Sequence, residues 1–372
     1  MQQADKKPIK KSGLEATGRS FSRGWRRLNG GMLLGFALCQ CWVTLCFFTP
    51  QLFPDNGSTR VYELSLIIST LALIPGVIYA RRFESVVDNR RALWLMAAGA
   101  SLGTLIIPFS GTDTFVEIAV MITAALLTGF ASGWLSVVWY RAFCLANDNI
   151  GFALSVATQS LIIYVLTSVV LPPTFSPWIM MTLSCLMPLA SVYLLLKSPR
   201  MSFPITAFTL SSLTHVQKQV LLRLCLGMFV VSFVDEFMRN YYLDGSDLAF
   251  YADTVNLVIL VLKVVCSVGI VAALVDSGRR ISLIYKASFL LTMMAVLFMP
   301  YLNYDAGYGV TNFGAFFFKI AVMLVAFTYC RRYRISPVLT FSLTRITWSL
   351  DLFLGVSAFH TCSIMEDSIP NL

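Results

Sequence analysis

Thr254–Val275 reads TVNLVILVLKVVCSVGIVAALV and is followed directly by the segment Asp276-Ser277-Gly278-Arg279-Arg280. At about 1.5 Å of rise per residue, this apolar run is long enough to cross a hydrocarbon layer of about 30 Å as a single helix. A glycine favours the left-handed turn that ends a helix, and arginines gather on the cytoplasmic side of a membrane. The stretch therefore predicts a membrane-spanning helix whose carboxyl end faces the cytoplasm.

The composition of the whole chain extends this prediction. Of the 372 residues, 57% are hydrophobic and 13% are charged, whereas roughly a quarter of the residues of a soluble domain are charged. The formal net charge of +9 does not indicate nucleic-acid binding, because the basic residues are concentrated in the amino-terminal tail and in alternate loops. We therefore predict a polytopic membrane protein whose main partner is the lipid bilayer, with no direct nucleic-acid binding by this chain.

The sequence shows no pattern that is typical of an enzyme. The nine cysteines lie almost entirely within apolar stretches, form no Cys-x-x-Cys pair and are accompanied by only two histidines. Zinc sites and disulfide frameworks need paired or clustered ligands, so small buried thiols are the simpler explanation. Nothing resembles a catalytic triad or a phosphate-binding loop. We expect neither catalysis nor a cofactor or metal ion.

Eleven apolar spans alternate with polar loops, and the charges of the loops indicate the orientation. Basic residues are frequent in the amino-terminal tail and after every second span, and sparse in the loops between, as the positive-inside rule requires. We predict a multi-pass protein of a bacterial cytoplasmic (inner) membrane with a cytoplasmic amino terminus. The predicted spans are 29–53, 61–80, 92–109, 115–140, 152–171, 178–196, 220–238, 254–275, 281–302, 312–330 and 337–359.

The spans fall into two blocks. Spans two, three and four begin about 190 to 197 residues before spans eight, nine and ten, the spacing expected of a tandem duplication with parallel repeats. The longest polar interruption separates the blocks, and the second block is one helix short of the first. We predict an all-α, two-bundle architecture with a basic cytoplasmic tail (1–28), a six-helix bundle (29–196), a cytoplasmic linker (197–219), a five-helix bundle (220–359) and an external tail (360–372).

The segment Asp276-x-Gly278-Arg279-Arg280 after an apolar span resembles the inner-loop signature of the major facilitator superfamily (MFS). The usual form places the aspartate one residue further from the glycine. The corresponding loop after the second span, Gly76–Arg82, lacks the acid. The resemblance implies an MFS-like fold of two helical bundles with a ligand site between them.

Two further stretches, Leu127–Tyr140 and Tyr333–Arg345 with its continuation to Gly355, resemble the membrane part of LuxR-type transcriptional regulators. In these bacterial proteins, a facilitator-like membrane domain precedes a cytoplasmic helix-turn-helix. A helix-turn-helix is not expected in the thirteen residues from His360 to Leu372. The resemblance implies a module that senses an unknown small molecule as the membrane part of such a regulator. The alternative is an MFS-type secondary transporter of a small solute.

Charged side chains inside the apolar spans of the second block form the candidate site. They usually face a water-filled cavity or one another, because a lone charge at the centre of a bilayer is costly. We predict that Lys319 pairs with Asp351 and that Lys263 faces Asp235 or Glu236. These five residues would form either ion pairs that hold the bundle together or a site for ligand binding or coupling.

Other residues of the spans have simpler interpretations. Arg345, nearer the inner side of the last span, has no obvious partner in the sequence. Gly129 and Gly133 are spaced four residues apart, which lets two membrane helices approach closely, so we predict helix packing rather than ligand contact. Trp139 lies two residues before Arg141 and is expected to anchor its helix at the membrane interface.

Overall fold

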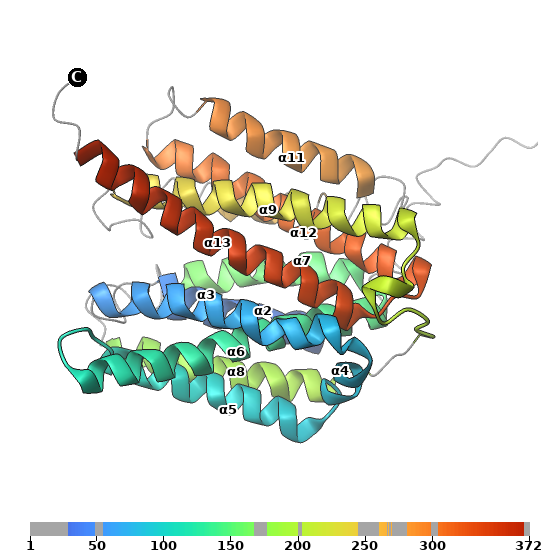
Figure 1. The fold of residues 1–372 in the computed structure, drawn as a ribbon, viewed down its shortest axis with the longest axis horizontal. Helices are drawn as coiled ribbons and strands as arrows, with labels where there is room; N and C mark the ends of the chain where they lie inside the picture. The colour runs from blue at the N-terminus through green and yellow to red at the C-terminus, as the bar shows by residue number, and fades with distance from the viewer. Residues whose placement is uncertain are drawn as a thin grey trace, which may run out of the picture.

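The computed structural model is a set of long helices with roughly parallel axes (Figure 1). Within the described residues there is no β-strand, and a single isolated bridge links Ala207 to Ile335. The predicted all-α architecture is confirmed for this part of the chain. The structure describes residues 29–48, 55–166, 177–199, 203–244, 260–265, 267, 269, 281–298 and 304–367.

The helices before residue 200 form one group, the amino-terminal group. Helix α6 packs against α3 and α5, whereas α2 packs against α7 and α8. Asp148 begins α7 because its side chain accepts a hydrogen bond of 2.7 Å from the backbone N–H of Gly151. The members of the group are α2 (Gly30–Phe48), α3 (Asp55–Ile78), α4 (Ala80–Val86), α5 (Arg90–Ile106), α6 (Phe115–Ala146), α7 (Asn149–Tyr164) and α8 (Pro177–Lys197).

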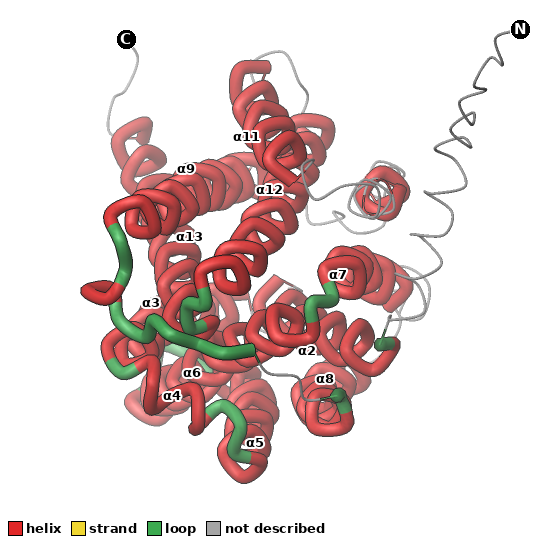
Figure 2. Tube along the Cα trace, turned by 90° about the vertical axis from the view of Figure 1, so that its right-hand side faces the viewer, coloured by secondary structure: helices red, strands yellow, loops and turns green. Residues whose placement is uncertain are grey.

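The helices after residue 214 form the carboxy-terminal group. Within the described chain these are α9 (His215–Asp244), α11 (Ile281–Phe298), α12 (Tyr304–Tyr333) and α13 (Pro337–Asp367), and residues 260–265 are also helical. Helix α9 packs against α12 and α13, and α11 packs against α12. The two groups meet mainly where α13 lies along α3 and α6, as the views along and across the helices show (Figures 1 and 2). Helix α13 therefore forms most of the described contact between the groups, and α12 adds smaller contacts with α6 and α7.

Four helices of the described chain contain stretches that are long and apolar enough to cross a membrane. These are Arg60–Ile78, Arg90–Phe109, Phe115–Ala146 and Phe313–Tyr333. Three shorter apolar helices occupy Gly30–Cys46, Asn149–Tyr164 and Met181–Lys197. A multi-pass membrane protein is therefore supported. The count of eleven spans stays a prediction, partly because most of the predicted span 254–275 lies outside the described residues.

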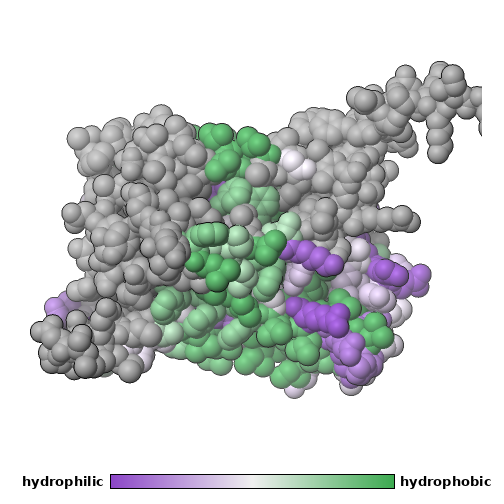
Figure 3. All heavy atoms as spheres, turned by 90° about the horizontal axis from the view of Figure 1, so that it is seen from above, coloured by the Kyte–Doolittle hydropathy of each residue, from purple (hydrophilic) through white to green (hydrophobic). Residues whose placement is uncertain are grey.

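The outer surface of the helices is apolar, as contact with lipid requires. Phe115, Val116 and Leu95 are 85%, 69% and 73% exposed. Figure 3 shows hydrophobic side chains over the middle of the described surface and hydrophilic ones towards the end at which α4 lies in Figure 1. Soluble monomers rarely expose large continuous apolar surfaces, so this pattern indicates a bilayer around the middle of the molecule.

The observed helices extend beyond several predicted spans. Helix α9 begins at His215 rather than at residue 220, because Thr214 and Gln217 each accept a hydrogen bond from the backbone N–H of the other. Helix α12 begins at Tyr304 rather than at residue 312, and α13 continues to Asp367, past the predicted end at residue 359. Hydrophobicity marks only the part of a helix that faces lipid, so it underestimates helix length.

Helices α3 and α6 approach closely at the two glycines singled out in the sequence. A Cβ atom on Gly129 would lie 2.5 Å from the backbone oxygen of Ser65, and one on Gly133 would lie 2.7 Å from Ser69 Oγ. At Gly129 a Cβ would meet backbone and could fit only if α3 moved, whereas at Gly133 it would meet side-chain atoms of Ser69 and Leu73. This is the geometry that a helix-packing role requires.

The structure corrects the prediction that Trp139 anchors its helix at the membrane interface. Its side chain is fully buried, and its indole N–H donates a hydrogen bond of 2.9 Å to Ser191 Oγ on α8. The expected role as an interfacial anchor is therefore wrong, because Trp139 lies inside the amino-terminal group. A tryptophan next to an arginine in the sequence does not show which side of its helix faces lipid.

Candidate functional site

Four segments that connect the long helices lie at the same end of the molecule, which we call the linker end: residues 79–90 (with the short helix α4), 147–149, 203–214 and 331–337. Thr206 N–H donates to the carbonyl oxygen of Arg334 at 2.8 Å, and Ser336 N–H donates to that of Ala207 at 2.8 Å. The linker between the groups is thus fixed to the turn between α12 and α13. Figure 2 shows this linker as a loop that crosses the near end of the molecule.

Glu84 joins the two groups at the linker end. One carboxylate oxygen accepts from Arg141 Nε at 2.6 Å within the amino-terminal group. The other accepts from Ser336 Oγ at 2.6 Å and from the backbone N–H of Val338 at 3.1 Å. Val338 lies in the first turn of α13, where the helix dipole also favours a negative charge. Arg141 is held in place by a second acid, because its Nη1 and Nη2 donate to Asp88 at 3.0 and 2.9 Å.

A second set of contacts links the groups beside Glu84. Arg331, at the end of α12, donates to the side-chain oxygens of Asn147 and Asn149, the latter at 2.9 Å. In the same loop, burial raises the pKa of the Asp148 carboxyl, although the N–H of Gly151 partly opposes this effect. Cys144 Sγ on α6 lies 3.9 Å from the carbonyl oxygen of Phe327 on α12, within electrostatic range of Cys330 on the same helix, and both thiols are buried. The linker end is therefore closed by polar and apolar contacts between the groups.

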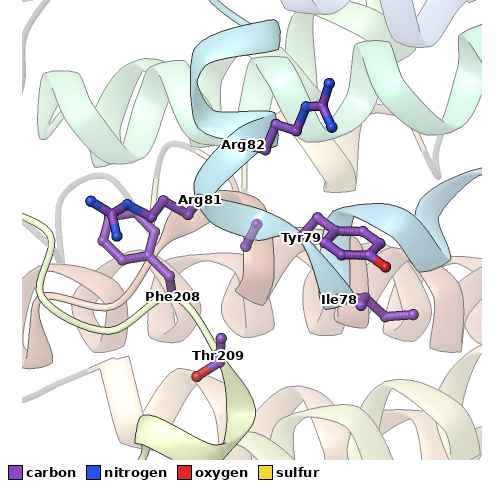
Figure 4. A pocket seen from close by; sticks show the side chains of 7 residues that line it. Ile78, Tyr79, Arg81, Arg82, Phe208 and Thr209 are labelled. Atoms are coloured by element: carbon purple, nitrogen blue, oxygen red, sulfur yellow. The ribbon is translucent and has the colours of Figure 1, made fainter.

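A hollow of about 310 Å³ also lies at the linker end (Figure 4). Its wall includes Arg81, whose guanidinium carbon lies 6.0 Å from the centre of the Phe208 ring. It does not include any of the charged residues that the sequence predicts as a site. The lining residues are Ile78, Tyr79, Ala80, Arg81, Arg82, Phe208 and Thr209.

The predicted pair of Lys319 and Asp351 does not form. Lys319 Nζ instead lies 4.2 Å from the centre of the Trp348 ring. The Asp351 side chain is fully buried, and neither of its carboxylate oxygens has a hydrogen-bond partner within the described chain. Asp351 is within electrostatic range of Cys225 on α9. The prediction was wrong because depth in the membrane does not fix the direction in which a side chain leaves its helix.

The other predicted charges lie on or beside α9. Lys263 Nζ lies 5.2 Å from the centre of the Phe316 ring and is within electrostatic range of Asp235. Glu236 is buried, and its Cβ lies 3.0 Å from the position of a Cβ on Gly355 of α13. Of the predicted site residues, Asp276, Gly278, Arg279 and Arg280 lie outside the described residues.

Arg345 is the residue whose importance the sequence did not reveal. It is only 3% exposed, and its guanidinium carbon lies 3.6 Å from the centre of the Trp348 ring. It is also within electrostatic range of Tyr140, Tyr62 and Cys39, which belong to three helices of the amino-terminal group. The sequence feature that could have identified Arg345 is its position inside an apolar span, because charged residues in such spans usually have a function.

The side of α13 that carries Arg345 faces the amino-terminal group. Ser349 Oγ lies 3.4 Å from Ser69 Oγ on α3, and a Cβ on Gly76 would lie 2.5 Å from Ser342 Oγ. Ser342, Arg345 and Ser349 are spaced three and four residues apart, so they lie on one side of the helix. A buried polar surface therefore runs along the contact between the groups. Among the described residues, no cluster of His, Cys, Asp or Glu could hold a metal ion.

No protein-family model matches the chain, and no curated protein sequence matches it. Among solved structures, 38 chains are similar. One is the human organic anion transporter MFSD10 (TETRAN), with a TM-score of 0.55 and 14% sequence identity over 90% of this chain and 92% of that chain. The chain has an MFS-like fold. The comparison confirms the coarse form of the predicted architecture, whereas it shows no relation to LuxR-type regulators.

Proposed function

We propose that this protein is an MFS-type secondary transporter that carries a small solute across a bacterial cytoplasmic membrane. The main support for this proposal is the burial of a cation, Arg345, at the contact between the two groups. Charged residues inside membrane proteins usually mark substrate or ion pathways. The human neighbour of similar fold is itself an organic anion transporter.

The arrangement supports alternating access, in which two helical units rock about a central site. These units would be the predicted bundles 29–196 and 220–359, with the amino terminus in the cytoplasm. Glu84 and Arg331 hold the units together at the linker end, so a solute could leave by this end only after these bonds break. The structure would then correspond to the state that is closed at the linker end.

The remaining charges have a place in this proposal. Asp235, Glu236, Lys263, Lys319 and Asp351 lie on helices of the moving carboxy-terminal unit. Asp351, a carboxyl without a hydrogen-bond partner among the described residues, is the proposed coupling group, because protonation would remove its buried charge. In this role it would take up a proton on one side of the membrane and release it on the other.

The second candidate is a sensor of the LuxR-regulator type, and it is supported by the sequence resemblance in Leu127–Tyr140 and Tyr333–Arg345. A sensor binds its ligand but does not move it across the membrane. The transporter is preferred because the fold comparison includes a transporter.

Uptake by proteoliposomes separates the two candidates. The full chain is reconstituted and offered radiolabelled organic acids, amino acids, sugars and amines, with and without a proton gradient. We expect saturable uptake of at least one solute, loss of uptake in Arg345→Gln and retention in Arg223→Gln, which removes an exposed arginine on α9. Binding of a solute without uptake under any gradient would favour the sensor and refute the transporter.

A further inference from the structure

Two cations contact the same indole ring in the carboxy-terminal group. Arg345 and Lys319 lie 3.6 and 4.2 Å from the centre of the Trp348 ring. The ring attracts cations, but it carries no net charge, and the two cations are within electrostatic range of each other. Asp235 is within electrostatic range of Lys319. Among the described residues, no aspartate or glutamate is within electrostatic range of Arg345, whose electrostatic partners are Tyr140, Tyr62 and Cys39.

Hydrogen-bond donors without partners accompany this positive charge. Within the described chain, neither Nε nor Nη1 of Arg345 has a partner, and the same is true of the Tyr140 hydroxyl. Both side chains are buried. The Tyr140 ring lies 5.7 Å from that of Phe341, one turn before Arg345 on α13. Arg345 is also within electrostatic range of Tyr140. Unfilled donors from both groups therefore lie close together, and a buried charge left without a partner is strongly unfavourable.

We infer that the solute is a small organic anion whose carboxylate binds Arg345 and Tyr140, with Lys319 adding positive charge beside it. This inference rests on the proposed transport function. A planar guanidinium matches the two oxygens of a carboxylate, and the tyrosine hydroxyl supplies a further donor. A cationic solute would meet two like charges, and a neutral one would leave the buried charge without a counterion.

The position of these donors also links binding to movement. Tyr140 belongs to the amino-terminal group, whereas Arg345, Lys319 and Trp348 belong to the carboxy-terminal group. An anion held by Tyr140 and Arg345 together contacts both groups at once, so its affinity depends on their relative position. A ligand shifts a conformational equilibrium only through such a difference in affinity between the states.

Equilibrium binding to the purified full chain in phosphatidylcholine nanodiscs tests the inference, because this lipid has no net charge. The radiolabelled probes are benzoate and succinate, their neutral counterparts benzamide and succinamide, and the cation benzylamine. We expect at least one carboxylate to bind about tenfold or more tightly than its amide, since a hydrogen bond to a charged group contributes about 1.5–3 kcal/mol. Affinity should fall by about tenfold or more in Arg345→Gln, fall less in Tyr140→Phe, and be unchanged in Arg223→Gln.

Other results overturn the inference. These are tighter binding of benzylamine or of an amide, no binding of either carboxylate, or unchanged affinity in both Arg345→Gln and Tyr140→Phe, each shown by its size-exclusion profile to be folded. Loss of benzoate or succinate binding when phosphatidylglycerol is added would identify the anion as a lipid headgroup, which also overturns it. Transport of a cationic or neutral solute would refute the anion and leave the transporter standing. Carboxylate binding without any uptake would refute the transporter alone.

Discussion

Replacing Glu84 with glutamine should open the linker end. Of the hydrogen bonds that Glu84 accepts, those from Ser336 Oγ and Val338 N–H cross between the groups, whereas the bond from Arg141 stays within one group. Opening therefore breaks the first two and keeps the third. A neutral acceptor weakens each by about 1 kcal/mol, and loss of the charge removes a further 0.3–1 kcal/mol or so of interaction with the α13 dipole. The closed state should become about 2–3 kcal/mol less stable relative to the open state, which shifts the equilibrium towards opening by about 30- to 150-fold.

The native thiols of Cys144 and Cys330 report this opening. Both are buried between the groups, and Cys144 Sγ lies 3.9 Å from the carbonyl oxygen of Phe327 on α12. Labelling by a membrane-impermeant maleimide in inside-out vesicles, measured at each cysteine by mass spectrometry, should accelerate by this factor in Glu84→Gln. The matched control is Asp88→Asn, because among the described residues Asp88 bonds only to Arg141 of its own group. Equal labelling of Glu84→Gln and the wild type, or an equal increase in Asp88→Asn, would show that the Glu84 bonds do not hold the linker end closed.

Three further predictions concern stability and are measured by thermal unfolding in detergent. Gly129→Ala should lower the free energy of unfolding by about 1–3 kcal/mol because its Cβ meets the backbone of Ser65. The control Gly99→Ala, whose Cβ would lie 3.7 Å from its nearest neighbour, should not be destabilised. Equal effects of the two substitutions would contradict the close packing at Gly129. Arg334→Gly should raise the free energy of unfolding by about 1 kcal/mol, because the φ of 53° at Arg334 strains any residue other than glycine. A lower melting temperature would exclude backbone strain at this position. Arg345→Met should raise the melting temperature without solute while abolishing uptake, because it removes a buried charge that lacks an ionic partner; a fall in melting temperature would show that Arg345 stabilises the contact instead.

Much of the fold follows from the sequence because a bilayer restricts it strongly. Charge deficit and apolar runs predicted an all-helical membrane protein, and the alternating basic loops predicted which segments share one end. The structure places the described loops 79–90, 147–149, 203–214 and 331–337 together, as that alternation expects. The ends of α9, α12 and α13 could not be predicted, because capping side chains such as Thr214 and Gln217 set them rather than hydrophobicity.

The candidate site was less predictable. Depth along each span suggested that Lys319 and Asp351 were partners, but a pairing also depends on rotation about the helix axis. In the structure, Lys319 contacts Trp348, whereas Asp351 is within electrostatic range of Cys225 on α9. Arg345 had no partner in the sequence because its neighbours Tyr140 and Tyr62 are uncharged residues of the other group.

Glu84 changes how the loop after the second span is interpreted. The segment Gly76–Arg82 lacks the acid of the inner-loop signature, and an incomplete signature is by itself a reason to doubt that a chain is an active carrier. The structure supplies a carboxylate two residues later, and it reaches the first turn of α13 in the other group. A motif search at fixed spacing misses this acid, because the chain continues as the short helix α4 and presents Glu84 one turn further on. The degenerate loop therefore no longer argues against transport.

The proposed transport cycle requires the two groups to move apart at the linker end while a solute crosses the membrane. Its most direct test measures uptake by proteoliposomes before and after oxidation links Cys144 to Cys330, whose thiols interact across the groups. We predict that the disulfide stops uptake, that a reducing agent restores it, and that Cys144→Ser removes the sensitivity to oxidation. Full uptake by protein shown to be completely cross-linked would show that the groups do not separate at the linker end during transport.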